Sequence, residues 1–381
     1  MEKLNVSELI EQKFGEQAVE LSLEQWKKAG NKVFGLTCNW VPEELLFAAN
    51  IVPRRFLAKL EDFEPAERYV YLDTCPYIRT CLLGTIQGLY NIDGVVYTKT
   101  CDQPCRMGDI LNYYVPFSFS HSFLMPRKRT TEGEELFAYE IRQLKEKLEE
   151  YIGGKISDEA LNKACETYNK SRILMRRLQN LRNLDAPPVS GNDALTVMKA
   201  AMTMPKNTFN GLLESLLAQL EAVDGTTAKS PRIVIAGALM DKSIFHKAIE
   251  EYGGIVVAED TCMGYQYFGF DGDDVEIGSD PTTALIKRYL YHMPCSAMFE
   301  ATQSGERYEN LIKIVKESKA DGVIFQHLQF CDCYSWDAPI YEEELNKLGI
   351  PCISLKTDYS WGSYGQIRTR VEAFLEMIAI L

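Results

Sequence analysis

The sequence lacks the features of several large protein classes. Its 381 residues contain no apolar run near the roughly 20 residues that span a bilayer. The first residues, Met1–Asn5, show neither the basic start nor the apolar core of a signal peptide. A net charge of −13 disfavours general binding to nucleic acid or to anionic lipid. We therefore expect a cytoplasmic protein that binds neither nucleic acid nor membrane.

Motifs for common chemistry are also missing. No G-x-G-x-x-G opens a helix after a strand, and no Walker loop or G-x-S-x-G elbow occurs. Paired C-x-x-C knuckles are absent, and the histidines show no ligand spacing: His121, His246, His292 and His327. The chain is therefore not expected to hydrolyse ATP itself, and a zinc site is disfavoured.

Apolar periodicity predicts an α/β protein in three parts. Expected strands in the N-terminal part are residues 32–38, 51–53, 69–72 and 93–97, and in the C-terminal part 232–236, 255–258, 321–325 and 351–355. A helical hairpin with a break at Gly153-Gly154 is predicted between them. Its arginines are expected on the solvent face: Arg172, Arg176, Arg177 and Arg182. We divide the chain into an N-terminal helix with a first α/β lobe (1–133), a helical region with a linker (134–228) and a second α/β lobe (229–381).

One short string occurs in each α/β part. Asp93-Gly94-Val95-Val96 leads to Cys101-Asp102, and Asp321-Gly322-Val323-Ile324 leads to Cys331-Asp332. Each copy places a cysteine beyond the carboxyl end of an expected strand, which is the edge where open α/β sheets bind ligands. Two facing lobes would bring cysteines of both halves into one cleft.

Eleven cysteines are the most unusual feature of the composition. Disulfides are not expected in a reducing cytosol. Loop-placed cysteines form three clusters, Cys75 with Cys81, Cys101 with Cys105, and Cys331 with Cys333, while Cys262 and Cys295 stand in further loops. Cys38 ends the first expected strand, and Cys165 and Cys352 are expected to be packed in the core. Varied spacing between separate loops favours an iron–sulfur cluster, with zinc and simple packing as alternatives.

Several longer strings point to a family. They are Val41-Pro42-Glu43-Glu44-Leu45, Asp73-Thr74-Cys75, Thr100-Cys101-Asp102, Phe330-Cys331-Asp332, Gly349-Ile350-Pro351, Thr357-Asp358-Tyr359-Ser360 and residues 366–374. Together they resemble the 2-hydroxyacyl-CoA dehydratase and benzoyl-CoA reductase subunit family along nearly the whole chain. The resemblance implies two Rossmann-like (flavodoxin-like) parallel-sheet lobes, an additional helical region, and an Fe–S cluster in the cleft between the lobes.

The resemblance also implies a mechanism and partners. In the dehydratases three cysteines hold a [4Fe-4S] cluster, and by motif these are Cys75, Cys101 and Cys331. A separate ATP-dependent Fe–S activator, a homodimeric ATPase, injects one low-potential electron. This electron generates a ketyl radical on an acyl-CoA. The partner is a homologous second subunit, or a second copy of the chain.

Departures from the dehydratase pattern leave alternatives open. Some family members are homodimeric reductases of small molecules with an [8Fe-9S] double-cubane cluster on six cysteines. Here the further candidate ligands are Cys81, Cys105, Cys262, Cys295 and Cys333. Asn39 and Arg54 stand near positions where dehydratases carry a small hydroxyl residue and an acid. A non-catalytic subunit that relays electrons is a third interpretation.

No catalytic residue is predicted firmly. Glu44 is a weak candidate for a general acid or base. Its place in the first turn of an expected helix offers a simpler explanation, because an acidic side chain there stabilises the helix dipole.

Overall fold

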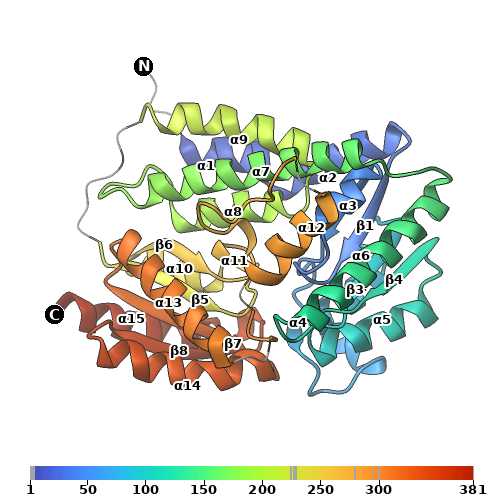
Figure 1. Ribbon diagram of the computed structural model, residues 1–381. Coiled ribbons are helices and arrows are strands. Elements are labelled where there is room, and N and C mark those ends of the chain that lie inside the picture. Colours follow the sequence, from blue (N-terminus) through green and yellow to red (C-terminus); the bar gives the residue numbers. More distant parts are fainter. Residues whose placement is uncertain are drawn as a thin grey trace.

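The computed structural model describes residues 5–223, 225, 230–278, 280–293, 295–298 and 301–380. Within these residues eight strands form two four-stranded parallel sheets, one in each lobe (Figure 1). The first sheet contains β1 (Lys32–Leu36), β2 (Ile51–Arg55), β3 (Gly94–Thr98) and β4 (Phe119–Phe123). The second contains β5 (Arg232–Gly237), β6 (Ile255–Asp260), β7 (Gly322–Leu328) and β8 (Cys352–Thr357). The predicted α/β class with two Rossmann-like lobes is confirmed.

Both sheets have the same topology. Their strand orders are β2-β1-β3-β4 and β6-β5-β7-β8, so the second and third strands of each sheet lie on opposite sides of the first. All strands run parallel, but the side on which the chain adds the next strand changes at β1 in one lobe and at β5 in the other. In open parallel sheets, ligands bind at the carboxyl ends of the strands that flank such a reversal.

The repeated string occupies equivalent places in the two sheets. Asp93 precedes β3, and its carboxylate accepts a hydrogen bond from the Val33 N–H at 2.9 Å. Asp321 precedes β7, and its carboxylate accepts one from the Arg232 N–H at 2.8 Å. The repeat thus marks the third strand of each lobe and joins it to the first.

Helices cover the sheets and link the lobes. The first lobe carries α1 (Val6–Phe14), α2 (Glu16–Lys28), α3 (Glu43–Ala48), the short helix η1 (Glu64–Arg68), α4 (Pro76–Ile86) and α5 (Asp102–Tyr114). The helical region consists of α6 (Thr131–Ile152), α7 (Asp158–Arg182), α8 (Gly191–Ala201) and α9 (Lys206–Leu220). The second lobe adds α10 (Ile244–Glu251), α11 (Tyr265–Phe268), α12 (Pro281–Ile286), η2 (Lys287–Tyr291), α13 (Ala301–Glu317), α14 (Asp332–Lys347), η3 (Trp361–Ser363) and α15 (Tyr364–Ile380). None of the described helices is both long and apolar enough to cross a bilayer.

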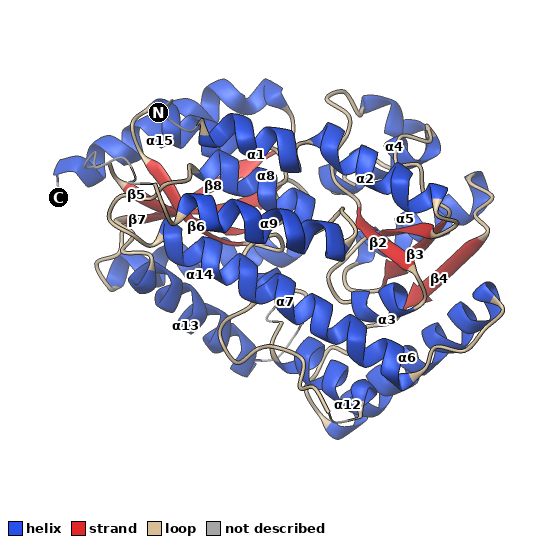
Figure 2. Cartoon of the chain, turned by 90° about the horizontal axis from the view of Figure 1, so that it is seen from above, coloured by secondary structure: helices blue, strands red, loops and turns tan. Residues whose placement is uncertain are grey.

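The predicted helical hairpin is confirmed as α6 and α7, with a left-handed Gly153 ending α6. Seen from above, α7 runs between the two lobes (Figure 2). Its arginines were expected in solvent, and this expectation is wrong for three of them. Arg172 pairs with Glu44 of the first lobe. In the second lobe Arg176 pairs with Asp274 and Arg182 with Glu259. All three arginines are buried. These buried ion pairs tie α7 to both lobes.

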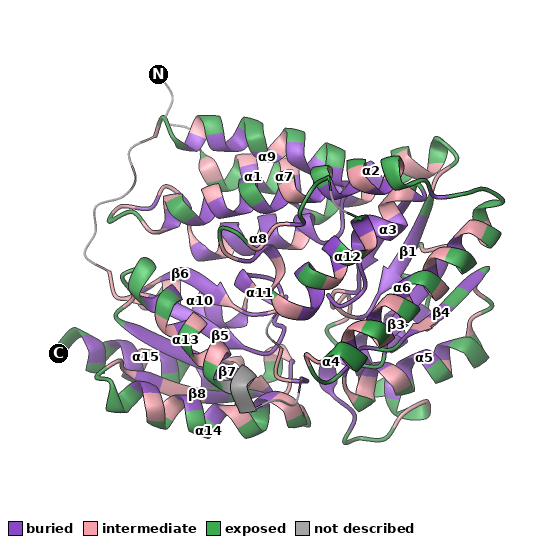
Figure 3. Cartoon of the chain, viewed as in Figure 1, coloured by how far each residue is buried: buried purple, intermediate pink, exposed green. Residues whose placement is uncertain are grey.

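Two details of the first sheet differ from expectation. Residues 69–72 form no strand, and Tyr71 and Leu72 are exposed. The fourth strand is instead β4, which pairs in parallel with β3. The strands of both sheets are largely buried (Figure 3), so their carboxyl ends open into the interior between the lobes.

Candidate metal centre

Three of the predicted ligands begin helices. Cys75 is the residue before α4, Cys101 the residue before α5, and Cys331 the residue before α14. The backbone N–H groups of Tyr77 and Ile78 donate to the Cys75 thiol. A helix N-terminus offers unpaired N–H groups and a positive dipole end, and both stabilise a thiolate. This placement suits cysteines that bind as anions.

These three thiols, here called the first thiol set, come together from both lobes. Cys75 and Cys101 belong to the first lobe, and Cys331 to the second. The Cys101 thiol interacts electrostatically with both others and shares a hydrogen bond with Cys333. That hydrogen bond lowers the pKa of the Cys333 thiol. The structure thus brings together the three cysteines that the sequence motifs identified, with Cys333 beside them.

A second thiol set consists of Cys38, Cys262 and Cys295. Cys38 lies just beyond β1 and Cys262 just beyond β6, while Cys295 lies in the segment after η2. The Cys295 thiol interacts with the thiols of both others. The two sets adjoin each other, because Cys262 is close enough to Cys331 to raise the pKa of its thiol. Sequence reasoning had not proposed Cys38 as a ligand, although it named Cys262 and Cys295.

A buried arginine faces the second thiol set. Arg55, the last residue of β2, is 5% exposed. Among the described residues its Nε and Nη1 atoms have no hydrogen-bond partner. Burial alone would lower the pKa of Arg55, yet Tyr77, Cys38 and Cys262 together raise it. A buried cation without an anionic partner is costly, so this guanidinium fits a site that holds negative charge.

The chemistry of the donors fits an iron–sulfur cluster. All cysteines are free thiols, and burial raises the pKa of Cys75 and of Cys262 to about 11. No described group of three or more Cys, His, Asp or Glu side chains converges tightly enough to hold a single metal ion. In a [4Fe-4S] cluster each thiolate binds a different iron, so its ligands surround the cluster instead of converging on one point. Neutral thiols spaced around an interior site match this requirement.

Two predicted candidates lie apart from both sets. The Cys81 thiol, inside α4, contacts the hydroxyl groups of Tyr77 and Tyr90. Cys105 lies one turn along α5, and its Sγ lies 3.5 Å from the Cys101 carbonyl oxygen. Cys101 stands at the N-terminal end of α5 and Cys105 a full turn further along it, so the two thiols are separated by about the rise of one helical turn.

Glu44 is held in a structural network. It is fully buried, forms an ion pair with Arg172 and accepts a hydrogen bond from the Tyr289 hydroxyl at 2.7 Å. Both carboxylate oxygens are therefore occupied. This geometry favours a role in joining α3 to α7 and η2 over a role as a general acid or base.

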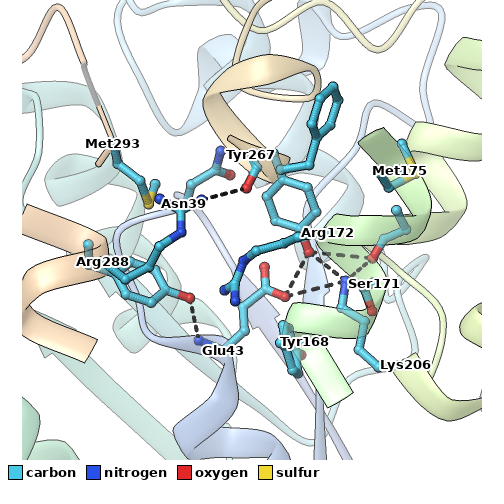
Figure 4. Close-up of a pocket in the computed structure, with 13 residues that line it drawn as sticks. Asn39, Glu43, Tyr168, Ser171, Arg172, Met175, Lys206, Tyr267, Arg288 and Met293 are labelled. Carbon is cyan, nitrogen blue, oxygen red and sulfur yellow. Dashed lines mark hydrogen bonds and ion pairs between the residues drawn. The ribbon is translucent and has the colours of Figure 1, made fainter. Parts of the chain in front are cut away.

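A small polar cavity lies behind the second thiol set. It measures about 20 Å³, which is room for about one water molecule. Its lining includes Asn39, Glu43, Lys206, Tyr267 and Arg288 (Figure 4). The Asn39 amide donates to the Cys262 carbonyl at 2.7 Å, so one lining residue contacts the loop that carries Cys262. Sequence reasoning missed this network.

Comparisons with known proteins show which family the chain belongs to. Residues 38–378 match the family described as 2-hydroxyglutaryl-CoA dehydratase, D-component. The chain is 26% identical over 359 residues to the (R)-phenyllactyl-CoA dehydratase beta subunit of Clostridium sporogenes, covering 93% of this chain and 94% of that protein. It is 26% identical to the beta subunit of (R)-2-hydroxyglutaryl-CoA dehydratase from Acidaminococcus fermentans (93% and 95%) and 24% identical to a benzoyl-CoA reductase subunit from Thauera aromatica (93% and 94%).

Proposed function

Since the chain belongs to the 2-hydroxyglutaryl-CoA dehydratase D-component family, we propose that this enzyme is a low-potential reductase whose six set cysteines hold an [8Fe-9S] double-cubane cluster. The observation that supports this proposal is the second thiol set. The cluster would be held by three thiolates from each set, one set from Cys75, Cys101 and Cys331 and the other from Cys38, Cys262 and Cys295. When bound, such a cluster supplies one-electron transfer at low potential.

The chain's own residues prepare the site for that group. Six thiolates bind the irons, and the helix N-termini before α4, α5 and α14 stabilise their charge. Arg55 adds a buried positive charge beside Cys38 and Cys262. Burial of Arg55 and Cys75 strengthens the electrostatic interactions of these two groups.

The electron donor and the assembly follow from the family. We propose a separate ATP-dependent Fe–S activator as the donor, because the sequence has no phosphate-binding loop of its own. A second copy of the chain, or a homologous partner chain, completes the enzyme. The relatives are themselves named as subunits, which supports such an assembly.

The substrate is proposed to be a small molecule. Arg54 stands near the position where dehydratases carry an acid, and its guanidinium is occupied by Glu20 and the Tyr90 carbonyl. Beside the second thiol set the cavity holds about one water. A second candidate function is the single-cubane [4Fe-4S] subunit of a 2-hydroxyacyl-CoA dehydratase acting on an acyl-CoA, which the names of two relatives favour.

Iron and acid-labile sulfide per chain test the proposal on anaerobically purified protein. We expect about eight iron and nine sulfide, falling to about half in Cys38→Ser and Cys262→Ser. Cys105→Ser is the matched control and keeps the full content. About four of each, unchanged by Cys38→Ser, would support the dehydratase interpretation and call for an acyl-CoA dehydration assay. Negligible iron after anaerobic reconstitution would contradict both.

A further inference from the structure

A hydrogen-bonded chain of three titratable side chains ends at the polar cavity. The Lys206 ammonium, from α9, donates to the Tyr267 hydroxyl at 2.6 Å. The Tyr267 hydroxyl, from α11, donates to the Glu43 carboxylate at 2.9 Å. Glu43 and Lys206 are buried, whereas Tyr267 is partly exposed. Continuous hydrogen bonds therefore run from a lysine through the hydroxyl group of a partly exposed tyrosine to a buried carboxylate.

One residue of the cavity lining, Asn39, links this chain to the second thiol set, because it follows Cys38 and its amide donates to the Cys262 carbonyl. Asn39 Oδ1 and Arg288 Nε are buried polar atoms without a partner among the described residues, and both residues line the cavity. A water molecule in the cavity would supply the hydrogen bonds that they lack. Each cysteine of the second thiol set is close in sequence to a residue that lines the cavity. Cys38 precedes Asn39, Cys262 stands five positions before Tyr267, and Cys295 stands two positions after Met293.

The charges around Glu43 favour a shared proton. Burial raises the pKa of Glu43, and the neighbouring charge of Glu44 raises it further. Lys206, the Tyr267 hydroxyl and Arg172 of α7 act in the opposite direction and lower it. The hydroxyl of Tyr289 in η2 donates a hydrogen bond to the neighbouring Glu44 carboxylate and accepts one from the Glu43 backbone N–H. Burial lowers the pKa of Lys206 to about 8. Burial thus favours the uncharged form of both partners, which narrows the gap between their proton affinities.

We propose that Glu43, Tyr267 and Lys206 form a proton relay that supplies the reaction beside the second thiol set. This inference rests on the proposed reductase function. Each electron that the substrate receives from the low-potential donor requires one proton. Glu43 passes its proton to the cavity water and on past Asn39, and the Tyr267 hydroxyl proton replaces it. Solvent then reprotonates Tyr267, whose transient negative charge the Lys206 ammonium balances.

Proton uptake on reduction tests the relay without knowledge of the substrate. Adding an electron at the thiol sets raises the proton affinity of the nearest titratable groups. The loaded protein is reduced anaerobically with a europium(II) chelate in weakly buffered solution containing a pH indicator. A potentiometric titration followed by electron paramagnetic resonance gives the midpoint potential against pH.

In the unaltered protein we expect proton uptake with each electron and a midpoint potential that falls as pH rises. Glu43→Gln and Tyr267→Phe should both lose the uptake and the pH dependence. Glu44→Gln is the matched control, because Glu44 is as buried, lies on the same helix and faces Arg172 instead of the cavity; it should keep both. Tyr267→Phe retains the carboxylate and remains informative if Glu43→Gln loads poorly.

Two results would overturn the relay: undiminished proton uptake in both relay variants, or equal losses in Glu44→Gln. Iron and sulfide counts on the same samples separate this outcome from failure of the proposed function. A chain with about four iron contradicts the double cubane, whereas a chain with about eight iron and unchanged proton uptake contradicts the relay alone.

Discussion

Replacing Arg55 with methionine should change stability in opposite directions with and without the cluster. Methionine keeps a long unbranched side chain in β2 and removes the charge. In the thiol form of the protein, the Nε and Nη1 groups of Arg55 are buried and have no partner among the described residues. The nearby Cys262 thiol is neutral there, because burial raises its pKa to about 11.

The magnitude follows from the two unsatisfied donors. Each buried donor without a partner costs about 1–3 kcal/mol. The Tyr77 ring, whose centroid lies 5.9 Å from the guanidinium, returns about 0.5–2 kcal/mol. The two donors together cost about 2–6 kcal/mol, so Arg55→Met should stabilise the cluster-free protein by about 1.5–4 kcal/mol. In the loaded protein the same change removes the partner of a buried negative charge, and it should destabilise by about 3–5 kcal/mol.

Anaerobic urea unfolding of both forms, followed by circular dichroism, measures the two effects. Arg182→Met is the matched control, because Arg182 is equally buried and its two terminal nitrogens already pair with Glu259 at 2.6 and 2.7 Å. That variant should lose stability in both forms. If Arg55→Met also destabilised both forms equally, the idea that this guanidinium awaits an anion would be refuted.

Three further predictions concern pH and packing. Because ligation needs thiolates and burial raises the pKa of Cys75 to about 11, cluster loading should release protons and improve as pH rises toward that value, as a pH-stat would record. Burial alone would raise the pKa of Glu259, but Arg182 and His246 outweigh burial and lower this pKa from 4.5 to about 2. Its stabilisation is therefore complete above pH 4.5 and lost as pH falls toward 2; Glu259→Gln should cost about 3–5 kcal/mol above that range in urea unfolding. Gly108→Ala should destabilise by about 1–3 kcal/mol in the same assay, because a Cβ there would lie 2.2 Å from the Tyr97 ring.

The sequence predicted the second sheet better than the first, for a physical reason. Three strands of the second sheet contain continuous apolar runs, as expected for strands buried on both faces: residues 233–236, 255–258 and 323–325. In β4, Phe119, His121 and Phe123 are buried while Ser120 is exposed, which is the alternation of a strand at a sheet edge. Residues 69–72 have aromatic and branched side chains of high strand propensity, but no neighbouring strand buries them.

The site was predictable only in part, because contacts between distant loops depend on topology. Motifs identified Cys75, Cys101 and Cys331, since each stands beside a recognisable strand or helix start. Asn39, the neighbour of Cys38, bonds to Cys262 across 223 positions of sequence, and nothing in that spacing shows that the two segments meet. Cys38 lies at the ligand-binding edge only because the strand order of the first sheet changes direction at β1, with β2 on one side and β3 on the other.

Two charged pairs inside apolar elements are a signal in the sequence that could have pointed to Glu43 and Arg55. Glu43-Glu44 opens α3, and Arg54-Arg55 ends β2, where all five residues are buried. Adjacent side chains on a strand point to opposite faces, so a buried Arg-Arg pair must place one guanidinium on each side of the sheet. Arg54 pairs with Glu20 on one side, which leaves Arg55 for the side of the thiols.

Both thiol sets contain cysteines of both lobes, and this arrangement couples cluster binding to the lobe interface. The first set takes two thiols from the first lobe and one from the second, and the second set takes Cys38 from the first lobe and the remaining two from the second. A group held by either set therefore bridges the lobes. Since binding to the folded state alone stabilises it by mass action, the proposed cluster would strengthen the same interface that the buried ion pairs of α7 already hold.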